Sequence, residues 1–275
     1  MKKNNFFKIT LLLIIGGFIT KILGMFIRIV LTRLIGTEGI GIYMLIMPTF
    51  SLLVAIAQLG FPVAISKLVA EDKYNNKNLV FGVIPISLII NIVIMFLLLI
   101  FGKFISNSLL NDSRTYLGII SIGFVLPFIS ISSILRGYFF GKERMFPHVL
   151  SNILEDVIRL ILIVIFIPIL VKKGIQFAVA FIILISIVSE LSSIIIFTIC
   201  LPKKTTITRD DFKPKKSNLK NIFSISLPTT GSRLIGNIGY FLEPIILTFC
   251  LTTSGYTNNF IVTEYGILNG SYILL

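Results

Sequence analysis

The chain has 275 residues, of which 55% are hydrophobic and only 13% charged, and its mean hydropathy is +0.98. Soluble domains carry about 25% charged residues, so this composition excludes an ordinary soluble protein and indicates an integral membrane protein. The net charge of +13 is explained by basic cytoplasmic loops and does not indicate a nucleic-acid partner.

Apolar runs long enough to cross a bilayer recur along the chain. A span needs about 20 mostly apolar residues, and its backbone groups must be satisfied within the segment, so we predict helices. The runs cover 9–32, 40–66, 79–102, 116–140, 148–171, 176–200 and 221–250, and an eighth begins near residue 261. The predicted fold class is an all-α membrane protein with about eight transmembrane helices. Prolines inside these runs predict kinks, namely at Pro48, Pro62, Pro85, Pro127, Pro168 and Pro228.

The positions of lysine and arginine predict the orientation. No small-residue cleavage site follows the first apolar run, so we interpret it as a span that is kept rather than a signal peptide. With the N-terminus inside, the cytoplasmic connections hold most of the connecting cations, and 201–220 is the most basic of them. The positive-inside rule therefore predicts a plasma-membrane protein with a cytoplasmic N-terminus. We interpret 201–220 as a basic cytoplasmic linker held near anionic membrane lipids, rather than as a specific binding site.

The seventh span repeats features of the first. Residues 20–24 read T-K-I-L-G and residues 232–236 read S-R-L-I-G, and Glu38 to Gly41 is followed in the same order by Glu264 to Gly266. Six spans separate the two copies, so both have the same orientation, as in transporters built from two parallel repeats. We therefore predict a six-helix first lobe over 1–200, the linker 201–220, and over 221–275 the start of a second lobe that this chain truncates.

Charged residues inside the spans are the candidate functional residues, because each is costly to insert. Gly17, Lys21, Gly24 and Arg28 recur at helical spacing, which puts two cations about 10 Å apart on one stripe of the first helix. Arg233 stands in the matching seventh helix. A cleft between these helices would present three cations, suited to an anionic substrate such as a pyrophosphate. The glycines Gly17, Gly24 and Gly236 are predicted to allow close helix packing or to act as hinges.

An alternative interpretation pairs these cations with intramembrane acids. Glu155 and Asp156 lie one turn from Arg159, so these three residues form either a coupling site or a structural ion pair. Arg136 is expected to extend toward the cytoplasmic surface. For Lys21 and Arg28 no acid lies within a helical turn, which favours a role in binding. The sequence contains no nucleophile–base pair, phosphate loop or metal-ligand motif, so we predict no enzyme activity, no metal and no cofactor.

Two motifs carry a resemblance to a known family. Residues 20–43, which read T-K-I-L-G-M-F-I-R-I-V-L-T-R-L-I-G-T-E-G-I-G-I-Y, and residues 136–139 with Gly141, Met145 and Pro147, followed by Glu155 and Arg159, are the matching positions. The chain resembles sporulation proteins of the polysaccharide-exporter branch of the multidrug/oligosaccharidyl-lipid/polysaccharide exporter superfamily, which is related to lipid II flippases. Members have a dozen or more helices in two lobes, so the resemblance implies a chain that continues beyond Leu275.

The resemblance implies a function as well as a fold. It implies a flippase for undecaprenyl-pyrophosphate-linked cell-wall or polysaccharide precursors, working by alternating access in spore cortex or peptidoglycan synthesis, with Lys21 and Arg28 at the positions of cavity cations. Lys21 is a lysine where lipid II flippases often have arginine, which argues against bidentate phosphate contact there. Two alternatives remain open. One is a multidrug cation exporter of the same superfamily, and the other is a truncated remnant or scaffold that does not transport.

Overall fold

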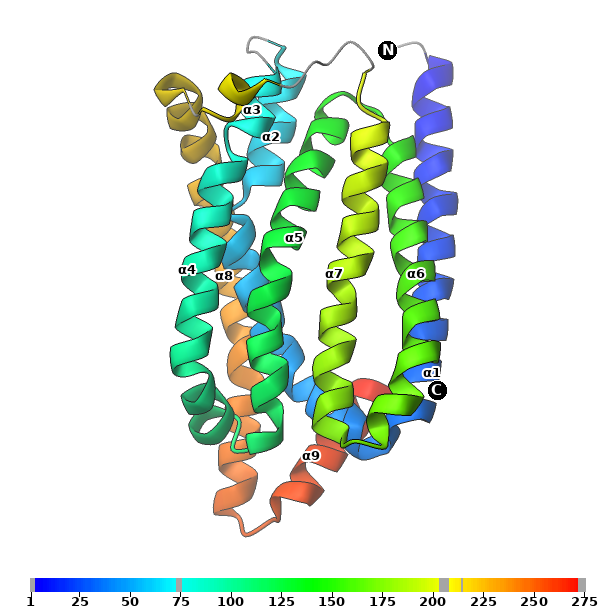
Figure 1. Ribbon diagram of the computed structural model, residues 1–275, viewed down its shortest axis with the longest axis vertical. Coiled ribbons are helices and arrows are strands. Elements are labelled where there is room, and N and C mark those ends of the chain that lie inside the picture. The colour runs from blue at the N-terminus through cyan, green and yellow to red at the C-terminus, as the bar shows by residue number, and fades with distance from the viewer. Residues whose placement is uncertain (1–2, 73–75, 203–207, 214, 272–275) are drawn as a thin grey trace.

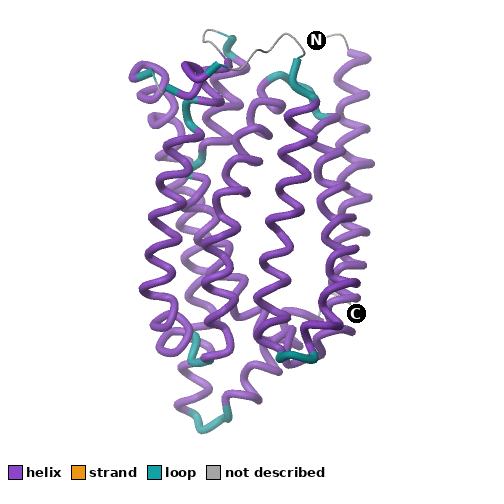
Figure 2. Tube along the Cα trace, in the orientation of Figure 1, coloured by secondary structure: helices purple, strands orange, loops and turns teal. Residues whose placement is uncertain are grey.

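A computed structural model describes residues 3–72, 76–202, 208–213 and 215–271. Every regular element among these residues is a helix, which confirms the predicted all-α class (Figure 2). The long helices are α1 (Lys3–Gln58), α4 (Ile84–Phe104), α5 (Tyr116–Gly141), α6 (Phe146–Val171), α7 (Ile175–Ile199) and α8 (Lys216–Thr253). The shorter ones are α2 (Phe61–Ala70), α3 (Asn76–Phe81), α9 (Asn258–Gly266), η1 (Ile105–Leu109), η2 (Ser113–Thr115), η3 (Arg209–Phe212) and η4 (Ile267–Ser271).

The helix α1 contains the first predicted span and most of the second. The two halves are divided at Gly36, whose φ of 68° and ψ of −177° are not helical and suit a residue without a Cβ. The second half ends earlier than predicted, because Leu59 and Gly60 both have positive φ and a new helix, α2, begins at Phe61.

The prolines occupy two kinds of position. Pro48, Pro127, Pro168 and Pro228 lie inside helices, as the sequence indicates. Pro62 and Pro85 instead lie in the first turn of α2 and of α4. A proline in the first turn costs no hydrogen bond, because that turn has no partner for its N–H groups. These two prolines therefore mark helix starts, where the sequence interpretation had kinks inside longer spans.

The helices stand roughly side by side along the long axis of the molecule (Figure 1). α5 packs against α2, α4 and α7, and α6 packs between α7 and α1. α8 and α9 pack against α1, and α8 also contacts α2. Small residues allow the closest approaches: a Cβ on Gly137 of α5 would lie 2.6 Å from the carbonyl oxygen of Pro62 in α2.

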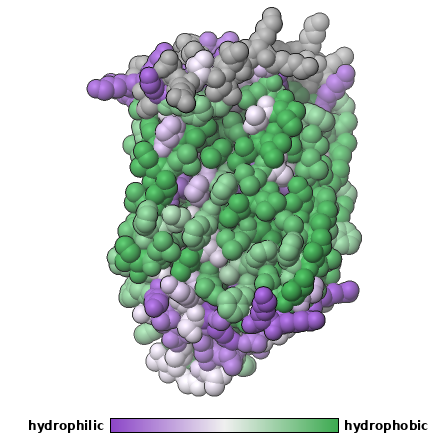
Figure 3. All heavy atoms as spheres, in the orientation of Figure 1, coloured by the Kyte–Doolittle hydropathy of each residue, from purple (hydrophilic) through white to green (hydrophobic). Residues whose placement is uncertain are grey.

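The surface has the pattern of a membrane-embedded protein. Five helical segments of the described residues are long and apolar enough to cross a membrane, and the first of them, Phe7–Ala70, includes both halves of α1. α6 is equally long but carries Glu155, Asp156 and Arg159. On the face shown in Figure 3, hydrophobic side chains form a broad band between two hydrophilic ends. The polar ends are the regions expected to meet water and lipid head groups.

The described part of the basic connection is attached to the helices rather than free. Asn78 of α3 donates from Nδ2 to the carbonyl oxygens of Asp211 (3.3 Å) and Lys213 (3.0 Å). Its own Oδ1 accepts from Nδ2 of Asn218 in α8 at 2.9 Å. The rings of Phe81 and Phe212 lie 5.4 Å apart. α8 already begins at Lys216, so the last residues of the predicted linker are helical.

Candidate substrate-binding cleft

A cleft of about 660 Å³ lies between the two halves of α1, α6, α8 and η4. The kink at Gly36 turns the second half of α1 back alongside the first, so that Arg28 and Tyr43 of the same helix line one space. Tyr240 of α8 and Arg159 of α6 line it too. Apolar side chains, among them Leu31, Met44, Met47, Phe50 and Val54, make up most of the remaining wall.

Arg28 is the cation of this cleft that has no acidic partner. Among the described residues no carboxylate oxygen lies within 4 Å of its guanidinium, whereas Arg159 pairs with two acids of its own helix. The Arg159 Nη2 donates to Glu155 Oε1 at 2.8 Å, and its Nη1 lies 3.7 Å from Asp156 Oδ1. Arg28 is partly buried, and a cation that is partly removed from water gains from a counter-charge, so Arg28 is the group best placed to take an anionic ligand.

Lys21 lies outside the cavity walls described here. Its side chain is exposed and stands seven residues before Arg28, about 10 Å along the helix axis. Gly24 does line the cleft. A Cβ on Gly17, Gly24 or Gly236 would meet no heavy atom within 4 Å, so these glycines face open space and make no close helix contact in this structure. A hinge role for them stays a prediction.

Arg233 lines a different pocket from Arg28. This pocket, of about 470 Å³, lies between α2, α5 and α8, and Arg233 donates there from Nη1 to Gln58 Oε1 at 3.3 Å. Arg233 is separated from the cleft by its position on α8. Tyr240, which lines the cleft, follows Arg233 by two helical turns, or about 10 Å along the helix. The structure therefore does not gather Lys21, Arg28 and Arg233 around one cavity.

A network of charged residues joins α5, α6 and α7 beside the cleft. Glu155, whose side chain is 13% exposed, accepts from Arg159 and, through Oε2, from Ser193 Oγ at 3.2 Å. The Arg136 Nη2 lies 3.8 Å from the same Oε2, so this arginine turns inward to an acid instead of extending toward the surface. Glu155 is therefore shared by two guanidinium groups. Its removal would leave both without their shared counter-charge.

A second cavity, of about 290 Å³, adjoins this network between α1, α5, α6 and α7. Arg159 and Glu190 line it together with apolar residues of α1, α5, α6 and α7. Glu190 is only 8% exposed, and its Oε2 has no hydrogen-bond partner among the described residues. No group of three or more His, Cys, Asp or Glu in the described residues is placed to hold a metal ion.

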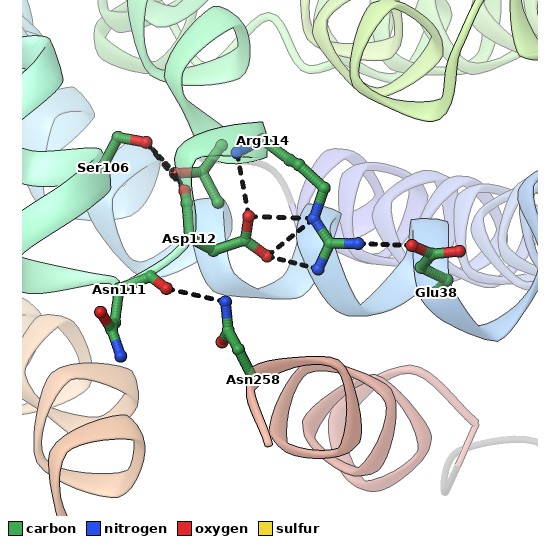
Figure 4. Close-up of polar contacts among 7 residues, drawn as sticks. Glu38, Ser106, Asn111, Asp112, Arg114 and Asn258 are labelled. Atoms are coloured by element: carbon green, nitrogen blue, oxygen red, sulfur yellow. Dashed lines mark hydrogen bonds and ion pairs between the residues drawn. The ribbon is translucent and has the colours of Figure 1, made fainter. Parts of the chain in front are cut away.

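A polar network surrounds the start of α5 and of α9 (Figure 4), which lie at the end of the molecule opposite the N-terminus (Figure 1). Arg114 donates from Nη2 to Asp112 Oδ2 at 2.7 Å and also pairs with Glu38, which follows the kink of α1. Nearby, Asn258 of α9 donates from Nδ2 to the carbonyl oxygen of Asn111 at 2.8 Å. The network thus ties the turn before α5 both to α1 and to α9.

Sequence reasoning did not identify Tyr43 and Tyr240 as residues of the cleft. Both become neighbours of Arg28 only when the second half of α1 and α8 fold against the first half. No local pattern of residues encodes that contact. Glu190 could have been identified from the sequence, because an acidic residue inside an apolar helix is costly and needs a partner or a function.

The helices and the hydrophobic band together define a helical multi-pass membrane protein. The chain belongs to the polysaccharide biosynthesis protein family, whose profile matches residues 6–275. It is 40% identical over 280 aligned residues to stage V sporulation protein B of Bacillus subtilis (strain 168), covering 98% of this chain and 54% of that protein. The resemblance inferred from the sequence is thereby confirmed, and the chain spans about half the length of that relative.

Two further comparisons agree with this family assignment and with the fold. Over 168 residues, which are 55% of this chain and 30% of the relative, it is 30% identical to the lipid II flippase MurJ of Bacillus subtilis (strain 168). A crystal structure of a MATE protein in the straight conformation matches with a TM-score of 0.70 and 20% identity, covering 95% of this chain and 63% of the other. At this identity the structural match shows a shared fold.

Proposed function

We propose that the chain forms the first lobe and the start of the second lobe of a flippase for an anionic, lipid-linked glycan precursor. The observation that carries the proposal is the position of Arg28 in a large apolar-walled cleft, where this cation has no acidic partner among the described residues. An apolar wall suits a polyprenyl chain, and a guanidinium suits its phosphate or pyrophosphate group. Its relatives include a protein named as a lipid II flippase.

The proposed setting is the plasma membrane, with the N-terminus in the cytoplasm and the precursor destined for spore cortex or other peptidoglycan. Sequence similarity to a sporulation protein of Bacillus subtilis supports this setting. In this orientation the network of Glu38, Arg114 and Asn258 lies at the outer face. The network would keep the outer end of the cleft closed while the ligand loads from the cytoplasm. Breaking its contacts would open the cleft to the outer face.

A reconstituted transport assay tests this proposal. Proteoliposomes containing the protein receive a fluorescent polyprenyl-pyrophosphate disaccharide, and the fraction that reaches the other leaflet is measured by reduction with dithionite. We expect transport, and we expect Arg28→Gln to slow it about tenfold or more, because one charge-assisted contact is worth about 1.5–3 kcal/mol. Arg33→Gln is the matched control, because Arg33 is exposed on the same helix and lines no cavity described here.

Two results would contradict the proposal. The first is an unchanged transport rate in Arg28→Gln while Arg33→Gln behaves in the same way. The second is transport of an organic cation such as ethidium with no movement of the pyrophosphate lipid, which would indicate a multidrug cation exporter. A cation exporter needs acidic groups facing its ligand, and Asp156 in the cleft already lies 3.7 Å from Arg159.

A further inference from the structure

The pocket between α2, α5 and α8 contains a second group of cations that is separate from the cleft. Lys67, Arg136 and Arg233 line it, one from each of these three helices, and none of the described residues that line it carries a carboxylate. The rest of its wall is neutral and largely apolar, and includes Pro62, Val63, Ser66, Ser133 and Phe140. Three positive charges thus face a space of about 470 Å³ without an acid among its lining residues.

These cations are only weakly compensated by the protein. Arg136 reaches Glu155 at 3.8 Å, but Glu155 already accepts a shorter contact of 2.8 Å from Arg159. The Nε of Arg136 is buried with no hydrogen-bond partner among the described residues. Arg233 donates to the neutral amide of Gln58, and Lys67 has no carboxylate within 4 Å in the part of the chain that the structure describes. Lys67 and Arg233 are exposed, whereas Arg136 is partly buried, so an anion in this pocket would give Arg136 the acceptor it lacks and would be attracted by the two exposed cations.

We propose that this pocket is a separate binding station for the phosphate or pyrophosphate group of the lipid carrier, occupied before the Arg28 cleft. The inference rests on the proposed function, and adds to it a second site with its own residues. Arg136 and Arg233 offer planar donors for phosphate oxygens, and Lys67 offers a point charge. Val63 and Phe140 give the first isoprene units an apolar surface. Gln58 holds Arg233 toward the pocket through its 3.3 Å contact.

The order of the two stations follows from their places along α8. This helix runs from the end of the molecule that holds the N-terminus toward the opposite end (Figure 1). Arg233 precedes Tyr240 by seven residues, so the pocket lies about 10 Å nearer the N-terminal end than the cleft. A ligand that loads from that end meets the pocket first, and then reaches Arg28 by moving two turns along α8.

The absence of tryptophan from the chain allows each station to be observed alone. Phe140→Trp places a fluorophore in the pocket, and Phe50→Trp places one in the cleft. Each single-tryptophan protein is titrated in nanodiscs with farnesyl pyrophosphate and, separately, with inorganic pyrophosphate. Val63→Trp serves as a second pocket reporter if Phe140→Trp lowers the yield of folded protein, because Val63 lines the same pocket and is 40% exposed.

We expect farnesyl pyrophosphate to change the emission of the pocket reporter. The double substitution Lys67→Gln with Arg233→Gln should weaken that binding about tenfold or more, since it removes two charge-assisted contacts. The cleft reporter should keep its affinity within about twofold. The matched control is Arg33→Gln with Lys172→Gln, which removes the same charge from exposed positions and should leave both affinities unchanged. Arg136 is left intact, because its loss would disturb the Glu155 network.

Each result decides for or against the second station. A pocket response to inorganic pyrophosphate that depends on Lys67 and Arg233 supports it and assigns recognition to the anion. A dependent response to farnesyl pyrophosphate alone supports it and assigns recognition to the lipid-linked form. A pocket reporter that stays silent while the cleft reporter responds overturns the inference and leaves the proposed function standing. A pocket response that the double substitution does not weaken also overturns it, and silence of both reporters overturns both proposals.

Discussion

Gly41 of α1 and Gly266 of α9 pack backbone against backbone. A Cβ added to Gly266 would lie 2.6 Å from both the Cα and the nitrogen of Gly41, and one added to Gly41 would run into the carbonyl oxygen of Val262. These glycines close the two short motifs, Glu38 to Gly41 and Glu264 to Gly266, that repeat along the sequence. The repeated motifs therefore meet each other at the end of the molecule where Arg114 pairs with Glu38.

Gly266→Ala should destabilise the protein, because the added methyl group must push α9 away from α1. Overpacking of this kind costs about 1–3 kcal/mol. The measurement is the melting temperature of the purified protein in detergent. Gly236→Ala is the matched control: a Cβ there meets nothing within 4 Å, so this variant should be neutral or gain up to about 1 kcal/mol. Equal melting temperatures for the two variants would show that the contact does not hold the helices.

Gly266→Ala should also make the cleft more accessible to water from that end. Asn269 lines the cleft, so Asn269→Cys in a protein whose Cys200 and Cys250 are changed to serine is a suitable label site. We expect a water-soluble maleimide added outside the cell to react faster with this cysteine when Gly266→Ala is present. No change in the labelling rate would mean that the contact is structural and not a gate.

Glu155→Gln should be one of the most destabilising substitutions within the membrane. It removes the carboxylate shared by Arg136 and Arg159, and because these side chains are partly buried we expect a loss below the ~3–5 kcal/mol that breaking a fully buried pair costs. Asp156→Asn is the comparison, because Asp156 makes one looser contact, 3.7 Å from Arg159. We expect a clearly larger fall in melting temperature for Glu155→Gln, measured in detergent at neutral pH. A larger fall for Asp156→Asn would contradict the network as described.

The bridge between Asp72 and Lys142 gives a pH-dependent prediction. Lys142 Nζ donates to Asp72 Oδ1 at 2.7 Å, and this hydrogen bond, followed by one from Asn76 and by the lysine charge, lowers the pKa of Asp72 from its ordinary 3.8. A pKa lower in the folded state adds stability above the unfolded value, and that stability is lost as the pH falls through the folded one.

The melting temperature of wild type should therefore exceed that of Asp72→Asn at pH 7, and the difference should be lost as the pH falls through the lowered pKa of Asp72. The bridge is exposed, so the difference is expected to be small and to shrink further in high salt. Glu71→Gln is the matched control, because it removes the charge of the neighbouring acid, which has no ion pair within 4 Å among the described residues. A difference between wild type and Asp72→Asn that persists into acid would contradict the assignment.

The helices could be predicted from the sequence because lipid imposes a local rule on every span. Runs such as 116–140 and 148–171 match α5 and α6 closely, since a span of about 20 apolar residues in lipid must make all its backbone hydrogen bonds within itself. The break at Gly60 was missed, because the apolar pattern continues through it while the backbone turns at two positive-φ residues.

The cavities could be predicted only in part. The spacing of Gly24 and Arg28 places both on the stripe that lines the cleft, because that relationship lies within one helix. The place of Arg233 depends on how far α8 slides along α1 and α2, which no local pattern specifies, and the structure puts it with Arg136 and Lys67. The glycines that do pack closely, Gly41 and Gly266, likewise depend on the contact between α1 and α9.

The most direct test of the central claim is equilibrium binding of radiolabelled farnesyl pyrophosphate to the purified protein in nanodiscs, with ethidium as the competing cation. The protein should bind the pyrophosphate saturably, Arg28→Gln should weaken the share of the binding that belongs to the cleft about tenfold or more, and Arg33→Gln should leave all binding unchanged. Excess ethidium should not displace the label. Binding that survives Arg28→Gln unaltered, or a protein that binds ethidium and not the pyrophosphate, would contradict an anion-binding cleft built around Arg28.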